Sequence, residues 1–182
     1  MQRTPIRSSA SAPSTTVRAP ARDRVDAHHH VWALARGDYG WLTPALAPIC
    51  RDFTLDDLKP IRTAAGVNAS VLVQAAPTIA ETEFLLATAR ASGGVVRGVV
   101  GWVDLAAADA IPVLKRLARD PLLKSVRPML QDLADPNWLL RADVGRALAA
   151  LPRLNLRCDA LVRPRELPAL VTMLKQQPEL AV

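Results

Sequence analysis

The chain has 182 residues, a length that fits one domain with a sizeable core. Half of the residues are hydrophobic and 22% are charged, which excludes a disordered protein, and no apolar run approaches the about 18 residues that a membrane-spanning helix needs. The net charge of +6 is unevenly distributed, because residues 1–24 contain five arginines and one acidic residue.

Residues 1–24 are expected to form a disordered basic extension. They are rich in Arg, Ser, Thr, Pro and Ala and contain no apolar segment of the kind found in secretory signals. Nucleic-acid binding is not expected, because it would need a basic folded surface with stacking aromatic side chains. The two cysteines, Cys50 and Cys158, form no CxxC motif and no disulfide framework, so a cytoplasmic location is expected.

Strands and helices alternate through the remainder of the chain. Apolar or β-branched runs predict strands at 24–28, 70–74, 95–102, 125–130 and 154–161, with a sixth strand starting at Leu180. Helical patterns separate these strands at 54–65, 78–92, 107–119, 143–151 and 164–177. This alternation is typical of a parallel α/β sheet with both faces covered.

Two helix starts carry capping residues. Thr54 can cap the helix that follows it, with Asp57 three residues further on, and the segment from Thr78 to Glu81 has the pattern of a capping box. Gly66 is placed to end the first of these helices.

Two closures of the sheet fit this alternation: an open doubly wound sheet and part of a (β/α)8 barrel. The first usually carries a glycine-rich turn after strand one, whereas this chain has three consecutive histidines there. In a barrel the active site lies at the carboxyl ends of the strands. Side chains that can bind or react stand at these ends, namely His28, His30, Gln74, Trp102, Asp104, Arg127 and Asp159. Because a complete barrel takes about 250 residues, we expect a partial (β/α)8 TIM barrel of about five strand–helix units plus the start of a sixth strand.

The most informative motif runs from Val25 to Trp32 and contains His28, His29 and His30. Side chains alternate along a strand, so His28 and His30 are expected on one face, about 7 Å apart, with His29 on the other. The pair could bind one divalent metal ion or one substrate oxygen. The alternative is that one histidine packs in the core while the others are solvated.

Several longer motifs follow one another along the chain. They are VDAHHHVW at 25–32, DYGWL at 38–42, RDFTLDDL at 51–58, VLVQAAPTIAETEFLL at 71–86, GVVGWVDL at 98–105, SVRPMLQDLADPNWLLR at 125–141 and CDALVRPRELPAL at 158–170. Together they resemble the amidohydrolase-2 family, in particular its lactonase-like metal-dependent TIM-barrel hydrolases of the L-fuconolactonase and L-rhamnonolactonase types. The chain departs from the family pattern at His29, where Gln is usual, and at Glu166, where His is frequent.

The resemblance implies that residues 25–182 form the N-terminal part of an amidohydrolase TIM-barrel domain. In the family, the strand that begins at Leu180 continues into an Asp-His pair, and a later strand supplies the aspartate that acts as general base. The implied reaction is hydrolysis of a sugar-type lactone, or a similar cyclic ester, by metal- or His-assisted attack of water. The alternatives are a catalytically inactive truncated fragment that lacks the later His and Asp, and a binding module with a basic tail.

The resemblance also implies roles for individual residues. His28 and His30 are the expected catalytic and metal-binding residues, with zinc or manganese as the divalent ion, and Asp26 is expected to orient them. The expected substrate-binding residues are Gln74, Arg127, Asp159, Trp32 and Trp41. Each of these five also has a structural alternative: an ion pair at the rim for the charged residues, a backbone contact for the glutamine, and loop packing for the tryptophans.

The expected partner is a small-molecule lactone or cyclic ester, with no nucleic acid and no membrane. An unclosed barrel exposes a strand edge and the apolar interior of its sheet, which a homo-oligomer could cover.

Overall fold

The computed structural model describes residues 24–182, so the extension predicted at 1–24 lies outside the described residues except for Arg24. Five parallel strands lie side by side in chain order: β1 (Val25–His29), β2 (Ala69–Val73), β3 (Val96–Gly101), β4 (Leu123–Val126) and β5 (Arg157–Cys158). This succession confirms the predicted α/β class and matches part of a (β/α)8 barrel, because the strand order of a doubly wound sheet reverses partway.

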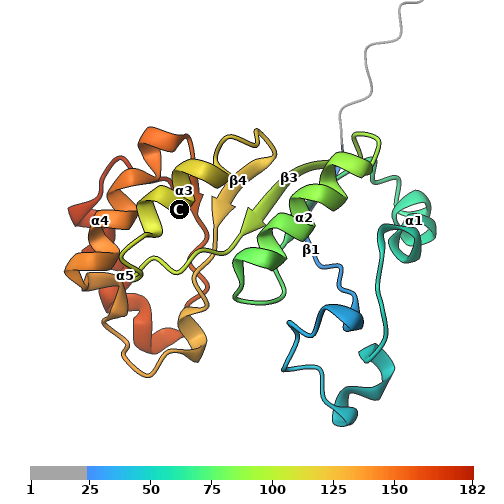
Figure 1. The fold of residues 1–182 in the computed structure, drawn as a ribbon, viewed down its shortest axis with the longest axis horizontal. Helices are drawn as coiled ribbons and strands as arrows, with labels where there is room; N and C mark the ends of the chain where they lie inside the picture. Colours follow the sequence, from blue (N-terminus) through green and yellow to red (C-terminus); the bar gives the residue numbers. More distant parts are fainter. Residues whose placement is uncertain (1–23) are drawn as a thin grey trace, which may run out of the picture.

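A helix follows each strand and returns the chain for the next parallel strand. The helices are α1 (Leu55–Ala64), α2 (Ile79–Ala91), α3 (Ala110–Leu117), α4 (Ala142–Ala150) and α5 (Leu167–Gln176). Short 3-10 turns lie at η1 (Leu34–Arg36), η2 (Pro44–Ile49), η3 (Leu130–Asp132), η4 (Trp138–Leu140), η5 (Pro152–Leu154) and η6 (Pro164–Glu166). In Figure 1, α2 runs beside β3, whereas α3, α4 and α5 gather at one end of the molecule and α1 stands at the other. Within residues 24–182, none of the helices has the length and apolar character to cross a membrane.

The sheet curves so that its first and fourth strands approach each other at their carboxyl ends. A guanidinium nitrogen of Arg127, directly after β4, lies 3.5 Å from Nε2 of His28 in β1, although β2 and β3 separate these strands in the sheet. The segment predicted to begin a sixth strand lies beside β5, because the amide of Cys158 donates a hydrogen bond to the carbonyl of Ala181 at 3.0 Å. The start of barrel closure is therefore present in residues 24–182.

Three strands lie within one residue of the predicted bounds at each end, and the other two differ by more. The strand predicted at 125–130 is found at Leu123–Val126, because Leu123 pairs with Val99 and the proline at 128 cannot extend the ladder. The strand predicted at 154–161 is reduced to Arg157–Cys158, since a 3-10 turn and the left-handed Asn155 (φ 56°) precede it.

The first predicted helix cap is confirmed and the second is confirmed in part. The hydroxyl of Thr54 accepts from the amide of Asp56, and the carboxylate of Asp57 accepts from the amide of Thr54 at 2.8 Å, which completes a capping box. The hydroxyl of Thr78 accepts from the amide of Glu81 at 2.9 Å. The Glu81 carboxylate does not return to Thr78, because it is fully buried and bound by other donors described below.

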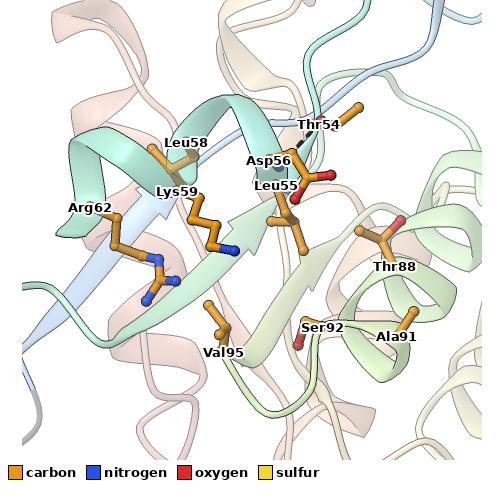
Figure 2. Close-up of a pocket in the computed structure, with 10 residues that line it drawn as sticks. All are labelled: Thr54, Leu55, Asp56, Leu58, Lys59, Arg62, Thr88, Ala91, Ser92 and Val95. Atoms are coloured by element: carbon orange, nitrogen blue, oxygen red, sulfur yellow. Dashed lines mark hydrogen bonds between the residues drawn. The ribbon is translucent and has the colours of Figure 1, made fainter.

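The core lies between the sheet and helices α2 to α5, whereas α1 contributes no fully buried side chain. Ile61 of α1 leaves 68% of its surface exposed. A cavity of about 470 Å³ separates α1 from α2, and Figure 2 shows Lys59 and Arg62 on one wall opposite Ser92 and Val95 on the other. None of its lining residues stands at the carboxyl end of a strand, so this cavity is not the candidate active site.

Candidate active site

His28 and His30 turn their imidazoles toward each other at the end of β1. Their Nε2 atoms lie 3.2 Å apart, and the ring centroids are 4.9 Å apart, closer than the spacing of about 7 Å expected along a strand. The Nδ1 atom of His30 lies 2.8 Å from the carbonyl oxygen of Val73, which can only accept, so Nδ1 carries the proton and Nε2 of the neutral ring carries a lone pair. The pair therefore directs ring nitrogens at one shared position.

His29 differs from its two neighbours in its surroundings. Its ring is half-buried, and neither ring nitrogen has a hydrogen-bond partner among the described residues. Burial lowers the pKa of His29, and burial likewise lowers the pKa of His30. Both rings therefore favour the neutral form.

Arg127 places a charged group beside the imidazole of His28. It is buried, donates from Nη2 to the carbonyl of Gln74 at 2.5 Å, and places Nη1 3.5 Å from Nε2 of His28. Burial lowers the pKa of Arg127, although the charge of Asp159 acts in the opposite direction. A guanidinium beside two imidazoles forms an electropositive edge suited to a carbonyl, carboxylate or hydroxyl oxygen.

Gln74 is fully buried directly after β2, and its side chain binds the backbone of the strand end that carries Arg127. Its Nε2 donates to the carbonyl of Arg127 at 3.1 Å and lies 3.1 Å from the sulfur of Met129. Its Oε1 has no hydrogen-bond partner within residues 24–182. Gln74 therefore links the end of β2 to Arg127 after β4.

Asp159 follows β5 and is held by a residue that the sequence reasoning missed. The hydroxyl of Ser125 in β4 donates to Oδ1 of Asp159 at 2.5 Å. Ser125 is buried and stands two residues before Arg127, so both face the same side of the sheet. The signal in the sequence was this spacing of two residues between Ser125 and Arg127.

Asp26 lies near the histidines but touches the backbone rather than the rings. Its Oδ1 accepts from the amide of His28 at 3.1 Å. Asp26 was expected to orient the histidines, and the hydrogen bond that the described residues show for it goes to the backbone of His28. Asp26 therefore shapes the end of β1.

Trp32 and Trp41 belong to the loop between β1 and α1. Their rings contact each other edge-to-face at 5.5 Å, and both indole N–H groups donate to carbonyls, one of Arg51 and the other of Ala75. Trp41 leaves 42% of its surface exposed. These contacts fix both rings in the loop and leave an exposed indole face at the rim.

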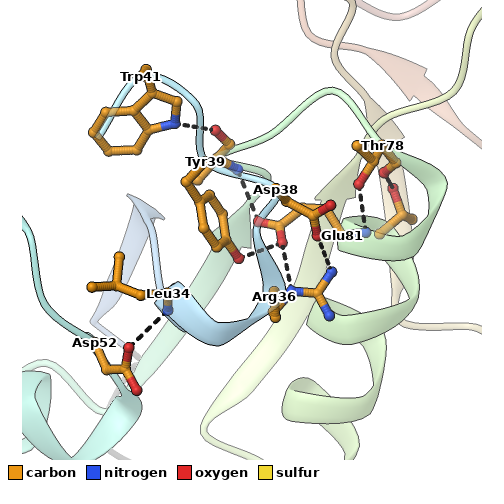
Figure 3. A network of polar contacts seen from close by, with 10 residues as sticks. Leu34, Arg36, Asp38, Tyr39, Trp41, Asp52, Thr78 and Glu81 are labelled. Carbon is orange, nitrogen blue, oxygen red and sulfur yellow. Dashed lines mark hydrogen bonds and ion pairs between the residues drawn. The ribbon is translucent and has the colours of Figure 1, made fainter. Parts of the chain in front are cut away.

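A buried polar network fastens this loop to α2 (Figure 3). The carboxylate of Glu81 accepts from the hydroxyl of Tyr39 at 2.7 Å and from the amide of Ala75 at 3.2 Å, and Nε of Arg36 lies 3.7 Å away. Arg36 also pairs with Asp38 at 2.5 Å. Burial raises the pKa of Glu81, and burial followed by the hydrogen bond to Glu81 raises the pKa of Tyr39 above its usual value. Sequence reasoning assigned Glu81 to a helix cap and did not find this network.

The geometry of His28 and His30 fits two positions of a metal site. Zinc–nitrogen bonds of about 2.0–2.1 Å at tetrahedral angles place two ligand nitrogens about 3.3 Å apart, close to the 3.2 Å observed. Within residues 24–182, no group of three or more His, Cys, Asp or Glu side chains is arranged to hold a metal ion. The described residues therefore supply half of such a site.

Known proteins resemble this chain in both sequence and fold. An L-fucono-1,5-lactonase of Burkholderia ambifaria is 43% identical over 159 residues, which are 87% of this chain and 54% of that protein. An L-fucono-1,5-lactonase of Burkholderia multivorans is 36% identical over 148 residues, which are 80% of this chain and 49% of that protein. This chain spans about half the length of the curated relatives that it matches.

The solved structures lead to the same family. The crystal structure of a Burkholderia multivorans amidohydrolase with bound zinc matches with a TM-score of 0.77 at 33% identity, and the match covers 87% of this chain and 55% of that one. A second crystal structure from the same organism, with bound HEPES, matches with a TM-score of 0.78 at 31% identity over the same shares. Residues 25–182 match the sequence model of the family described as Amidohydrolase (Amidohydro_2). The chain belongs to the amidohydrolase family.

Proposed function

We propose that this chain forms the N-terminal part of a hydrolase that opens a sugar-type lactone, such as L-fucono-1,5-lactone. The observation that carries the proposal is the convergence of His28 and His30 beside Arg127 at the carboxyl ends of β1 and β4. The names of two relatives, both L-fucono-1,5-lactonases, support the substrate class.

Each residue of the site has a role in this proposal. Arg127 holds an oxygen of the lactone and stabilises the negative charge that develops on it during attack by water. Asp159, fixed by Ser125, accepts a hydrogen bond from a substrate hydroxyl. Gln74 positions Arg127, because its side-chain Nε2 donates to the carbonyl of Arg127 and its own carbonyl accepts from the guanidinium.

A divalent ion fits the same site. His28 and His30 would hold it through Nε2, and the ion would polarise the carbonyl or lower the pKa of an attacking water. Imidazole ligands suit zinc, and manganese is the second candidate. The zinc bound in one structural relative supports the first choice for this chain.

The direct test measures acid release from L-fucono-1,5-lactone in a weakly buffered dye assay. The chain is assayed alone and as a chimera in which residues 24–182 replace the matching half of the Burkholderia ambifaria lactonase. We expect the chimera to hydrolyse the lactone and H28N or R127M to reduce kcat/KM at least 100-fold. A folded chimera without activity would contradict the proposal, and so would a chimera whose kcat/KM is unchanged by both substitutions.

The second candidate is a catalytically inactive fragment. It is favoured by the absence of a third metal-binding side chain near His28 and His30 among residues 24–182. Under this reading the 182-residue chain has no lactonase activity, whereas the chimera is active. Robust turnover by the chain alone would exclude this candidate.

The remaining proposals concern location and assembly. Cys50 and Cys158 are both free thiols, which is compatible with a reducing cytoplasm. β1 is an edge strand, and its Val25 leaves 47% of its surface exposed, so a second copy of the chain could pack against this edge. Size-exclusion chromatography with light scattering tests this assembly.

A further inference from the structure

A second cavity, of about 280 Å³, lies at the carboxyl ends of β3 and β4. Its walls come from the loops that follow β2, β3 and β4. The residues that matter for its chemistry are Trp102, Asp104, Met129, Asp132 and Trp138. A cavity near 300 Å³ is of the size that binds a small organic ligand.

This cavity adjoins the histidine site. Met129 lines it and also lies 3.1 Å from Nε2 of Gln74, which in turn donates to the carbonyl of Arg127. Pro128, another lining residue, directly follows Arg127 in the chain. Met129 and Pro128 therefore connect the cavity wall to Gln74 and Arg127 of the histidine site.

The indole rings that line the cavity differ in their hydrogen bonding from those in the loop after β1. The indole N–H groups of Trp32 and Trp41 donate to backbone carbonyls. Within the described part of the chain, the indole N–H groups of Trp102 and Trp138 have no hydrogen-bond acceptor, although both residues are only half-exposed. Two aromatic faces with free donors therefore border the cavity.

The carboxylates complete the set of polar groups. Oδ1 of Asp104 accepts from the amide of Ala106 at 3.0 Å, and Oδ2 of Asp132 accepts from the side chain of Gln131 at 3.1 Å. In each residue the other oxygen makes no hydrogen bond to residues 24–182. The backbone of Trp102 is also fixed, because Thr82 Oγ1 donates to its carbonyl and accepts from its amide.

We propose that this cavity is the subsite for the hydroxylated part of the lactone ring. Sugar hydroxyls need both acceptors and donors, which free carboxylate oxygens and indole N–H groups supply, while the C–H face of the ring packs on an indole. The inference rests on the proposed function, because it assigns one part of that substrate to the cavity and the carbonyl to His28, His30 and Arg127.

The experiment uses the complete 182-residue chain and two stable probes that each contain half of the substrate's chemistry. L-Fucose has the hydroxylated six-membered ring without the lactone carbonyl, and δ-valerolactone has the lactone without hydroxyls. Saturation-transfer NMR titrations measure the Kd of each. Asp104→Asn keeps the acceptor for Ala106 while removing the charge, and Trp138→Leu removes one ring.

The matched control is Asp109→Asn, an exposed aspartate of the same loop that makes no capping contact and does not line the cavity. We expect D104N and W138L to raise the Kd for L-fucose at least fivefold, D109N to leave it within twofold, and δ-valerolactone binding to be unchanged in all three. Trp102→Phe, which keeps a smaller aromatic ring and loses the N–H, provides a second test if W138L fails to melt cooperatively.

The two proposals fail separately. If L-fucose does not bind the native chain, or binds D104N and W102F as tightly as the native chain, the subsite is overturned even when the chimera hydrolyses lactone. If L-fucose binding depends on Asp104 while the chimera is inactive, the subsite stands and the proposed reaction is wrong.

Discussion

Arg127 reaches from the end of β4 to His28 in β1, with a guanidinium nitrogen 3.5 Å from the imidazole Nε2. The two residues are 99 positions apart in the chain. The same guanidinium donates to the carbonyl of Gln74 at the end of β2. One buried side chain thus links three strands at the edge where the reaction is proposed, so substitutions of Arg127 affect both stability and activity.

Replacement of Arg127 by Lys is expected to destabilise the fold by about 1–3 kcal/mol, the usual effect of leaving a buried polar group unsatisfied. A lysine ammonium cannot reach both Gln74 and His28 with the planar geometry of the guanidinium. Urea unfolding followed by circular dichroism measures the change. The control is Arg153→Lys at an exposed position of η5, expected within about 0.5 kcal/mol of the native chain. Equal stability of both variants would contradict the linking role.

The hydrogen bond between Tyr39 and Glu81 predicts a dependence of stability on alkaline pH. Burial and this bond raise the folded-state pKa of Tyr39 above its unfolded value of about 10. The stabilisation is therefore fully present below pH 10 and is lost as pH rises through the folded pKa. Since the chain has one tyrosine, absorbance at 295 nm reports this group alone.

We expect the absorbance titration of the folded chain to have its midpoint above pH 10 and to return to about 10 in concentrated urea. Glu81→Gln removes the carboxylate charge but keeps an acceptor, so it should bring the folded midpoint closer to 10. A native midpoint at 10 would show that the network in Figure 3 does not hold the phenol.

Gly101 in β3 is expected to tolerate no larger residue. A Cβ atom there would lie 2.5 Å from Cγ2 of Thr82 and 3.1 Å from Cδ1 of Leu123, both on neighbouring elements. Gly101→Ala should destabilise by about 1–3 kcal/mol through overpacking. In contrast, Gly145 of α4 has no atom within 4 Å of the corresponding position, so Gly145→Ala should stabilise the chain by up to about 1 kcal/mol. Thermal melts of the two variants should shift in opposite directions.

The two thiols are expected to differ in reactivity. Cys158 is buried in β5, and burial raises its pKa to about 12, whereas Cys50 is half-buried in the loop before α1. Because the thiolate is the reactive form, an aromatic disulfide reagent at pH 8 should label Cys50 and leave Cys158 unlabelled in the folded chain. Cys50→Ala should then show no fast labelling until urea is added, and fast labelling without urea would contradict the burial of β5.

Local features of this chain could be predicted because they depend on neighbouring residues. Strand alternation predicted that His28 and His30 share one face, and in the structure their Nε2 atoms lie 3.2 Å apart. The cap at Thr54 also forms as predicted, because its partners lie within the next three residues. The succession of strands and helices was sufficient to predict a parallel sheet.

The contacts that could not be predicted from the sequence depend on long-range packing. Thr78 and Glu81 have the pattern of a capping box. The Glu81 carboxylate is buried, however, and accepts a hydrogen bond from Tyr39, 42 residues away in the chain. Sequence periodicity also could not reveal that Ser125 holds Asp159 from a neighbouring strand. Which residues share a strand face could be predicted from the sequence, since that follows from backbone geometry. Which of these residues contact one another could not be predicted, because curvature of the sheet and competition for buried hydrogen-bond partners depend on the whole fold.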